Sequence, residues 1–300
     1  MKYSSLQSRT IEWLRFFCAA LVVFLHAFGP REASYKNGVY DILRILLSQG
    51  IGRVAVPIFF LISGYLFFIK LENWNTKIWI NKCKKRIHTL LIPYFVWNLI
   101  AIILSLFFYS KRYIFNGAPA PNLISWFESI GGIRAFWNSK SGLWPIDGPL
   151  WFIRNLIILV IFSPIIQYFV KKTGIIGLLI LGILYYFRWW IKIPGFECIG
   201  FMFFSLGAFF SIKKIDFASL FQNYRQLITC FALPSLVGMV LTYGNNNAIY
   251  IKLCDFFTLF GSASIIGIVS YLISNNKLHE RALLSNSSFL IYAAHNVFLL

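Results

Sequence analysis

The sequence predicts an all-α protein, a single polytopic bundle of transmembrane helices. Of its 300 residues, 58% are hydrophobic, 19% are aromatic and only 13% are charged. In soluble domains about a quarter of all residues are charged, so this composition excludes an ordinary water-soluble enzyme and a disordered chain. Apolar runs of membrane-spanning length recur along the sequence without a fixed-period repeat, and we therefore treat residues 1–300 as one transmembrane domain.

Each apolar run is interpreted as one helix, because a hydrocarbon core about 30 Å thick needs roughly 20 residues. No small-residue cleavage site follows the first run, which favours a retained helix over a signal peptide. A ninth run starts near Asn286 and has about 15 residues, or roughly 22 Å, which is short of a full span. We therefore expect the sequence as given to stop inside that helix. The eight earlier runs predict helices at about 11–28, 51–69, 90–109, 150–170, 174–190, 197–212, 226–243 and 253–273.

The distribution of Lys and Arg predicts the orientation of the chain. These residues are denser in one set of alternate connections, most of all in the run Lys82–Arg86, which favours a cytoplasmic N-terminus. The net charge of +18 is then explained by loops that face anionic lipid. No nucleic-acid partner is expected, because no aromatic-basic module or zinc spacing accompanies the charge. The five scattered cysteines indicate neither a disulfide framework nor a metal site.

The longest stretch without a spanning run is 110–149, which contains several Gly and Pro residues. Such long connections in a compact fold are usually functional, so we expect an outer loop that acts as a lid or binds an acceptor.

Charged groups inside a membrane helix are costly, and the first helix contains Glu12, Arg15 and His26. Arg15 and His26 are eleven residues apart, which places them on one face and roughly 16.5 Å apart along the axis. Glu12 precedes Arg15 by three residues, a spacing that permits an ion pair. One interpretation is that Glu12 and Arg15 reach the interface while His26 serves packing. The other is a polar path with a cation at one end and a titratable base at the other.

Arg53 is expected at a depth similar to that of His26, and Arg154 is also expected on the outer side. They either extend to the interface or bind an anion or stabilise an oxyanion. Lys85 and Arg86 either anchor the cytoplasmic side or bind nucleotide phosphates. The pair Ser63–Gly64 favours close helix packing, His295 favours a structural role and Trp151 favours an interfacial anchor. Asp147 and Glu197 are carboxylates near outer helix ends that could orient His26, although no sequence pattern places them beside it.

Five segments follow one another in a fixed order along nearly the whole chain. The first is an arginine, ten residues and a histidine, from Arg15 to His26. The others are Val56–Tyr65, Ile92-Pro93-Tyr94, Leu150-Trp151-Phe152 and Phe289–His295. In this order they resemble the acyltransferase-3 family of membrane proteins. The family's inner loop often carries a second basic residue three positions after its arginine, whereas here Thr89 follows Arg86.

The resemblance implies about ten helices in the bacterial inner membrane and O-acylation of an envelope carbohydrate. It implies acyl-CoA, usually acetyl-CoA, as a cytoplasmic donor substrate, and no bound cofactor. Carried over by residue, Arg15 and His26 are the essential pair, and Arg53, Ser63 and Gly64 form the second-helix motif. On this interpretation the catalytic residues are His26, Arg15 and Arg53, and the substrate-binding residues are Glu12, Ser63, Gly64, Lys85, Arg86, Trp151, Arg154 and His295.

His26 is either a general base toward the acceptor hydroxyl or a relay that carries the acyl group. Two other functions are compatible with the same polar path: a transporter or flippase of a polar metabolite or glycan, and a non-catalytic partner of a glycan assembly machine. The acceptor, the acyl chain length and the oligomeric state are not encoded in any pattern that we can interpret.

Overall fold

The computed structural model describes residues 5–27, 38–69, 75–116, 122–139, 142–243, 247–279 and 282–299, and these residues form helices and connecting turns without a strand. The predicted all-α class is thereby confirmed. The helices, with η marking 3₁₀ and π turns, are α1 (Ser5–Ala27), α2 (Val39–Arg44), η1 (Ile45–Gly50), η2 (Ile51–Val54), α3 (Ala55–Phe68), α4 (Thr76–Arg86), η3 (Ile87–Leu91), α5 (Ile92–Asn116), α6 (Leu123–Ile130), η4 (Gly132–Phe136), η5 (Gly148–Leu150), α7 (Trp151–Ile161), α8 (Ser163–Phe187), α9 (Cys198–Ile212), α10 (Phe217–Asn223), α11 (Arg225–Thr242), α12 (Asn247–Ser274) and α13 (Ala282–Leu299).

Within the described residues, 6 helices are long and apolar enough to cross a membrane. The number is 7 if α9 and α10, which are bent by 104° at their junction, count as one span. The sequence predicts eight helices and an incomplete ninth, because hydropathy treats every apolar run alike. In the structure α7 has only 11 residues, and the polar run Ser285–Ser288 lowers the hydropathy of α13.

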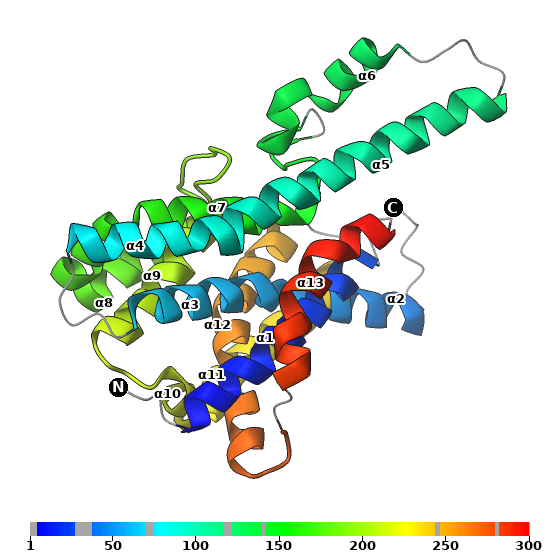
Figure 1. Ribbon diagram of the computed structural model, residues 1–300. Helices are drawn as coiled ribbons and strands as arrows, with labels where there is room; N and C mark the ends of the chain where they lie inside the picture. The colour runs from blue at the N-terminus through cyan, green and yellow to red at the C-terminus, as the bar shows by residue number, and fades with distance from the viewer. Residues whose placement is uncertain are drawn as a thin grey trace. The chain divides into compact units, whose positions relative to one another are not determined.

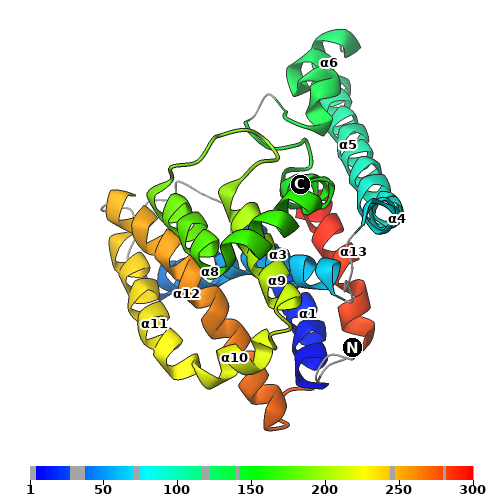
Figure 2. The ribbon, with the colours of Figure 1, turned by 90° about the vertical axis from the view of Figure 1, so that its left-hand side faces the viewer.

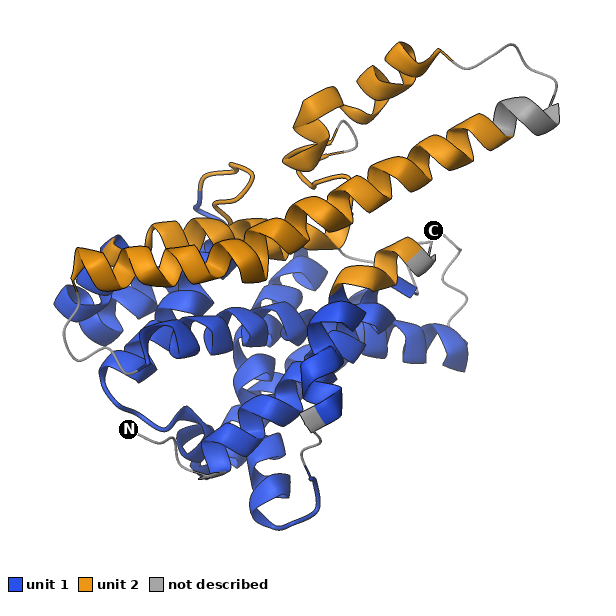
Figure 3. Ribbon diagram, in the orientation of Figure 1, with its two compact units in different colours: residues 1–72, 165–190, 198–292 blue, residues 73–164, 191–197, 293–300 orange. Residues whose placement is uncertain are grey.

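The chain divides into two compact units (Figure 3). Unit 1 comprises residues 1–72, 165–190 and 198–292, and unit 2 comprises residues 73–164, 191–197 and 293–300. Unit 1 therefore contains α1 to α3, most of α8, α9 to α12 and the first half of α13. Unit 2 contains α4 to α7, a short segment before α9 and the end of α13.

Two close helix pairs form the core of unit 1. At the crossing of α3 and α9, a Cβ on Gly64 would overlap the carbonyl oxygen of Phe204, and one on Gly207 would overlap that of Leu61. Glycine is therefore required at both positions, because each backbone occupies the space of the other's side chain. The second pair is α11 and α12, which lie side by side (Figures 1 and 2).

The predicted second helix, 51–69, is the end of a longer apolar run, Val39–Phe68, in which the helix changes its winding. The π turn η1 and the 3₁₀ turn η2 lie between α2 and α3. Irregular turns inside a helix often mark functional positions, and η2 contains Arg53.

The predicted helix 150–170 is wrong as a single element, because the chain breaks at Phe162 between α7 and α8. Pro164 has no N–H to donate to the carbonyl of Val160, one turn earlier. That oxygen instead accepts hydrogen bonds from Ser163 Oγ at 2.7 Å and from Trp79 Nε1 at 3.3 Å. Further along, the backbone leaves helical geometry at Gly174, with φ of 56°, which matches the predicted boundary between two helices.

Unit 2 contains a longer helix than the sequence predicts. The helices α4 and α5 join through the π turn η3 into the apolar run Thr76–Lys111 (Figure 1). The basic run Lys82–Arg86 therefore lies on α4 and not in a loop. The helix begins there because Asn75 caps it, its side chain accepting a hydrogen bond from the N–H of Ile78 at 2.9 Å.

The prediction of a loop at 110–149 is also wrong in part. Residues up to Asn116 extend α5, and α6 packs back against it through the rings of Tyr109 and Trp126, whose centroids are 6.3 Å apart. The segment does contain the turns η4 and η5. The residues Gly117, Pro119 and Pro121, which contributed to the loop prediction, lie outside the described residues.

Candidate functional site

The predicted site residues divide between the two units. Unit 1 contains Glu12, Arg15, His26, Arg53, Ser63 and Gly64, and unit 2 contains Lys85, Arg86, Trp151, Arg154 and His295.

Within unit 1, the end of α1 that carries His26 packs beside the turn that carries Arg53. The contact is made by their sequence neighbours: a Cβ on Gly52 would lie 3.5 Å from both the carbonyl oxygen of Leu21 and the Cβ of Leu25. His26 and Arg53 are both half-buried. The structure thus brings the C-terminal half of α1 and the turn η2 together.

Arg53 carries a positive charge inside an apolar helix run without an ion-pair partner among the described residues. Its Nη2 donates a hydrogen bond to Oε1 of Gln49 at 3.0 Å, while its buried Nε has no partner. The guanidinium lies close enough to act electrostatically on Tyr185, Tyr250 and Cys254. An unneutralised guanidinium surrounded by hydroxyl and thiol groups is suited to bind an anion or a developing oxyanion.

The nearby carboxylate of Asp255 is already occupied. Arg188 donates to it twice, from Nε to Oδ2 at 2.8 Å and from Nη2 to Oδ1 at 3.0 Å. This two-point geometry neutralises Asp255 and leaves the charge of Arg53 uncompensated by it. Sequence reasoning missed the pair, because 67 positions separate the two residues.

At the other end of α1, Glu12 lines a cavity of about 240 Å³ together with Trp13, Phe17 and His279. Among the ion pairs of the described residues there is none between Glu12 and Arg15, although their spacing permits one. Arg15 is half-buried on α1, and its backbone position keeps the predicted relation to His26 on one helix.

The role of Gly64 is structural, since it allows the contact between α3 and α9 described above. Ser63 is half-buried beside it. The family motif in this region therefore fixes the position of α3, while Arg53 at the N-terminal side of α3 supplies the charge.

In unit 2, Arg154 ties a loop to α7. The side chain is 0% exposed, and its Nη1 donates to the carbonyl oxygens of Trp137 and Leu143, the latter at 3.1 Å. Its Nη2 pairs with Glu197 Oε1 at 3.0 Å. These bonds leave only Nε without a partner, so Arg53 and not Arg154 is the better candidate for an oxyanion.

Asp147 forms a second buried polar group in unit 2. Its Oδ1 accepts a hydrogen bond from Nδ2 of Asn296 at 3.0 Å, and its backbone N–H donates to Oδ1 of Asn98 at 3.2 Å. The side chain is 0% exposed, and Oδ2 has no partner. Burial raises the pKa of Asp147 to about 7, against the opposing effect of the Asn296 hydrogen bond. The structure thus gives Asp147 and Glu197, both named from sequence, partners within unit 2.

The other predicted residues of unit 2 lie on three helices. His295 is buried on α13, next to Asn296. Trp151 begins α7, and its ring packs against Trp144 with centroids 5.4 Å apart. Lys85 is exposed on α4, and Arg86 is half-buried. The described residues contain no group of three or more His, Cys, Asp or Glu that could hold a metal ion.

Comparison with known proteins identifies the family. Residues 9–300 match the model of the acyltransferase domain of acyltransferase type 3. A stretch of 184 residues, or 58% of this chain, is 24% identical to the succinoglycan biosynthesis protein ExoH of Rhizobium meliloti (strain 1021). The alignment spans 46% of that relative, so the chain covers about half of its length. No solved structure gives a significant match.

Proposed function

Because this chain belongs to the acyltransferase-3 family, we propose that it is an integral membrane O-acyltransferase that modifies an envelope carbohydrate. The donor in this proposal is acyl-CoA on the cytoplasmic side, and the transferred group is acetyl. The chain is a multi-pass membrane protein. We propose that it resides in the bacterial inner membrane with its N-terminus in the cytoplasm, as the distribution of Lys and Arg favours.

The observation that carries the proposal is the packing of the His26 end of α1 against the turn that holds Arg53. Acyl transfer to a hydroxyl needs a base for the hydroxyl proton and a positive group for the oxyanion that forms on the carbonyl. Of the two residue types in this pair, only histidine ordinarily changes its charge near neutral pH, which suits His26 to the role of base. Arg53 brings a charge without an ion-pair partner among the described residues.

In the proposed reaction, His26 takes the proton of the acceptor hydroxyl as its oxygen attacks the thioester carbonyl. The carbonyl oxygen becomes an oxyanion, which hydrogen bonds from the guanidinium of Arg53 stabilise. Collapse of this intermediate breaks the bond between carbon and sulfur, and the CoA thiolate leaves and recovers the proton. In the second version, His26 attacks first and carries the acyl group to the hydroxyl. Both versions require an unprotonated imidazole at the start.

The phosphates of the donor are assigned to Arg15, about 16.5 Å from His26 along α1. Guanidinium groups bind phosphates with two parallel hydrogen bonds, which a lysine cannot reproduce. We propose that Lys85 and Arg86 also bind the donor phosphates, because both are positively charged and Lys85 is exposed. The proposed acceptor class is supported by the similarity to a succinoglycan biosynthesis protein.

The experiment follows labelled acetyl from acetyl-CoA into envelope glycans, in membranes that contain either the native protein or the His26→Ala variant at matched levels. We expect label incorporation by the variant to be at least about 100-fold lower than by the native protein, which is the typical contribution of a general base. Phe24→Ala is the control, because this side chain is exposed two residues earlier on the same helix. Equal label in the native protein and His26→Ala would contradict the proposal.

A further inference from the structure

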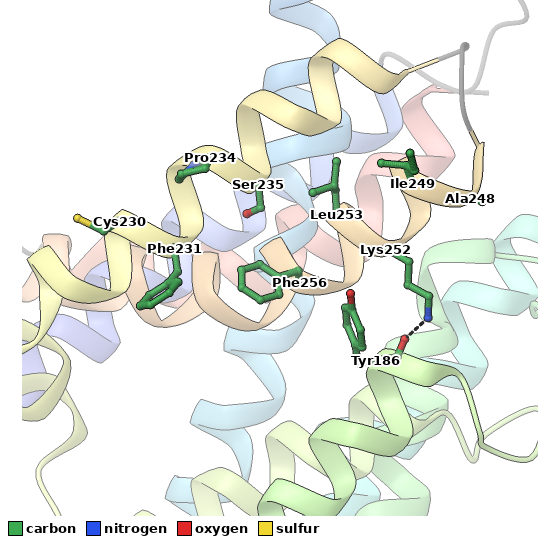
Figure 4. A pocket seen from close by; sticks show the side chains of 10 residues that line it. All are labelled: Tyr186, Cys230, Phe231, Pro234, Ser235, Ala248, Ile249, Lys252, Leu253 and Phe256. Atoms are coloured by element: carbon green, nitrogen blue, oxygen red, sulfur yellow. Dashed lines mark hydrogen bonds between the residues drawn. The ribbon is translucent and has the colours of Figure 1, made fainter.

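A lateral groove lies between α11 and α12, far along the chain from the residues assigned to acyl transfer. Its volume is about 590 Å³, within the range of small-ligand sites. Its wall is apolar for most of its length, as Figure 4 shows. We name it the α11/α12 groove; it is lined by Tyr186, Cys230, Phe231, Pro234, Ser235, Ala248, Ile249, Lys252, Leu253 and Phe256.

One end of the groove carries a fixed positive charge. Lys252 Nζ donates a hydrogen bond to the backbone carbonyl of Tyr186 at 2.6 Å (Figure 4). It also lies 4.7 Å from the centre of the Tyr186 ring and 5.2 Å from that of Phe187. These contacts hold the ammonium at the groove mouth and use one of its three N–H groups. No ion pair involves Lys252 among the residues that the structure describes, so its charge is available to an anion.

The groove runs along the membrane-spanning part of both helices. From Ala248 to Phe256 it follows α12 over nine residues, a rise of about 12 Å, which is close to the depth of one leaflet of a bilayer with a core of about 30 Å. Lys252 is the sixth residue of α12 and so lies near the end of the helix, where a lipid headgroup would be. An apolar trough of leaflet depth with a cation near its end matches the form of a phospholipid.

We propose that the α11/α12 groove binds one anionic phospholipid. Its phosphate accepts hydrogen bonds from the two remaining N–H groups of Lys252. One acyl chain lies against the apolar wall at Ile249, Leu253 and Phe256. The apolar wall accepts a zwitterionic lipid equally well. The headgroup of such a lipid already carries a cation, so it gains less from the charge of Lys252. The preference for a lipid with net negative charge therefore depends on Lys252. This proposal does not rest on the proposed acyl transfer.

The test measures lipid retention by the purified protein. The protein is exposed to vesicles with equal amounts of phosphatidylglycerol and phosphatidylcholine, re-extracted, and examined by native mass spectrometry. We expect a preference of about fivefold for phosphatidylglycerol, the effect of one lysine near a surface. Lys252→Gln removes the preference, whereas Lys252→Arg keeps it. Lys277→Gln is the matched control, because it removes the same charge from an exposed position outside the groove.

A second variant fills the apolar part of the groove. Ile249→Trp, at a half-exposed position, places a large ring in the groove and should reduce retention of both lipids. Elution profile and circular dichroism establish that each variant is folded. Equal retention of both lipids by the native chain, or an unchanged preference in Lys252→Gln, would overturn the proposal. So would a dimer that Ile249→Trp abolishes, because the groove would then hold a second copy of the chain.

Discussion

Asn296 donates a hydrogen bond to the carboxylate of Asp147 at 3.0 Å, across 149 positions of the chain. Asp147 is fully buried, and its second carboxylate oxygen has no partner among the described residues. Burial removes water from the charged carboxylate without replacing all of its hydrogen bonds, so the neutral acid is favoured in the folded state. This single relationship links the end of α13 to the turn before α7 within unit 2.

The first prediction concerns the pH dependence of stability. Burial raises the pKa of Asp147 from 3.8 to about 7 in the folded protein. A group with a raised folded pKa contributes stability that is fully present below its unfolded pKa and is lost as the pH rises through the folded value. The melting temperature in detergent should therefore fall by several degrees between pH 4 and pH 8, which corresponds to a few kcal/mol.

The control for this effect is Asp147→Asn. The amide keeps an oxygen acceptor for Asn296 but cannot ionise. The variant should melt at a higher temperature than the native protein at pH 8, and the part of the pH slope due to Asp147 should disappear. A native-like slope in Asp147→Asn would assign the titration to another group.

The second prediction concerns the ion pair of Arg154 and Glu197. Glu197→Gln leaves the fully buried guanidinium of Arg154 without a countercharge, which typically costs about 3–5 kcal/mol. Thermal unfolding should show a loss of that order. Arg134→Gln, which removes an exposed arginine from the same unit, should have almost no effect. If both variants melt alike, the ion pair does not stabilise unit 2.

The third prediction concerns the crossing of α3 and α9. Gly64→Ala places a methyl group on the carbonyl oxygen of Phe204, and neither backbone can move without separating the helices. Overpacking of this kind costs about 1–3 kcal/mol. The yield of folded, monodisperse protein should fall. Gly182→Ala is the comparison, since its added carbon would meet only the end of the Met202 side chain, at 3.9 Å; an equal loss in both variants would indicate a general effect of glycine replacement.

The regular helices could be predicted from the sequence because their apolar runs are long. The irregular parts could not. The break at Phe162 arises from Pro164 and from side-chain hydrogen bonds to the carbonyl of Val160. The helix α4 continues into α5 through the π turn η3, which ends just before Ile92 and Pro93. Hydropathy averages over such local geometry and places the basic run Lys82–Arg86 in a loop.

The candidate site shows the same division. The position of Arg15 and His26 on one face of a helix could be predicted, because eleven residues make close to three full turns. The packing of Gly52 against α1, which brings Arg53 toward the His26 end, depends on contacts between helices. The pairs of Arg188 with Asp255 and of Asn296 with Asp147 join residues 67 and 149 positions apart, and no local pattern indicates them.

The central claim is that His26 and Arg53 act together in the same acyl-transfer step, His26 on the acceptor hydroxyl and Arg53 on the carbonyl oxygen. The most direct measurement compares initial rates of acetyl transfer for the native protein, His26→Ala, Arg53→Gln and the double variant, at matched expression. Residues that act as a unit lose less together than the product of their separate losses. We predict that each single variant loses at least about 100-fold and that the double variant is little worse than either. Full activity in either single variant, or losses that multiply, would contradict a shared centre.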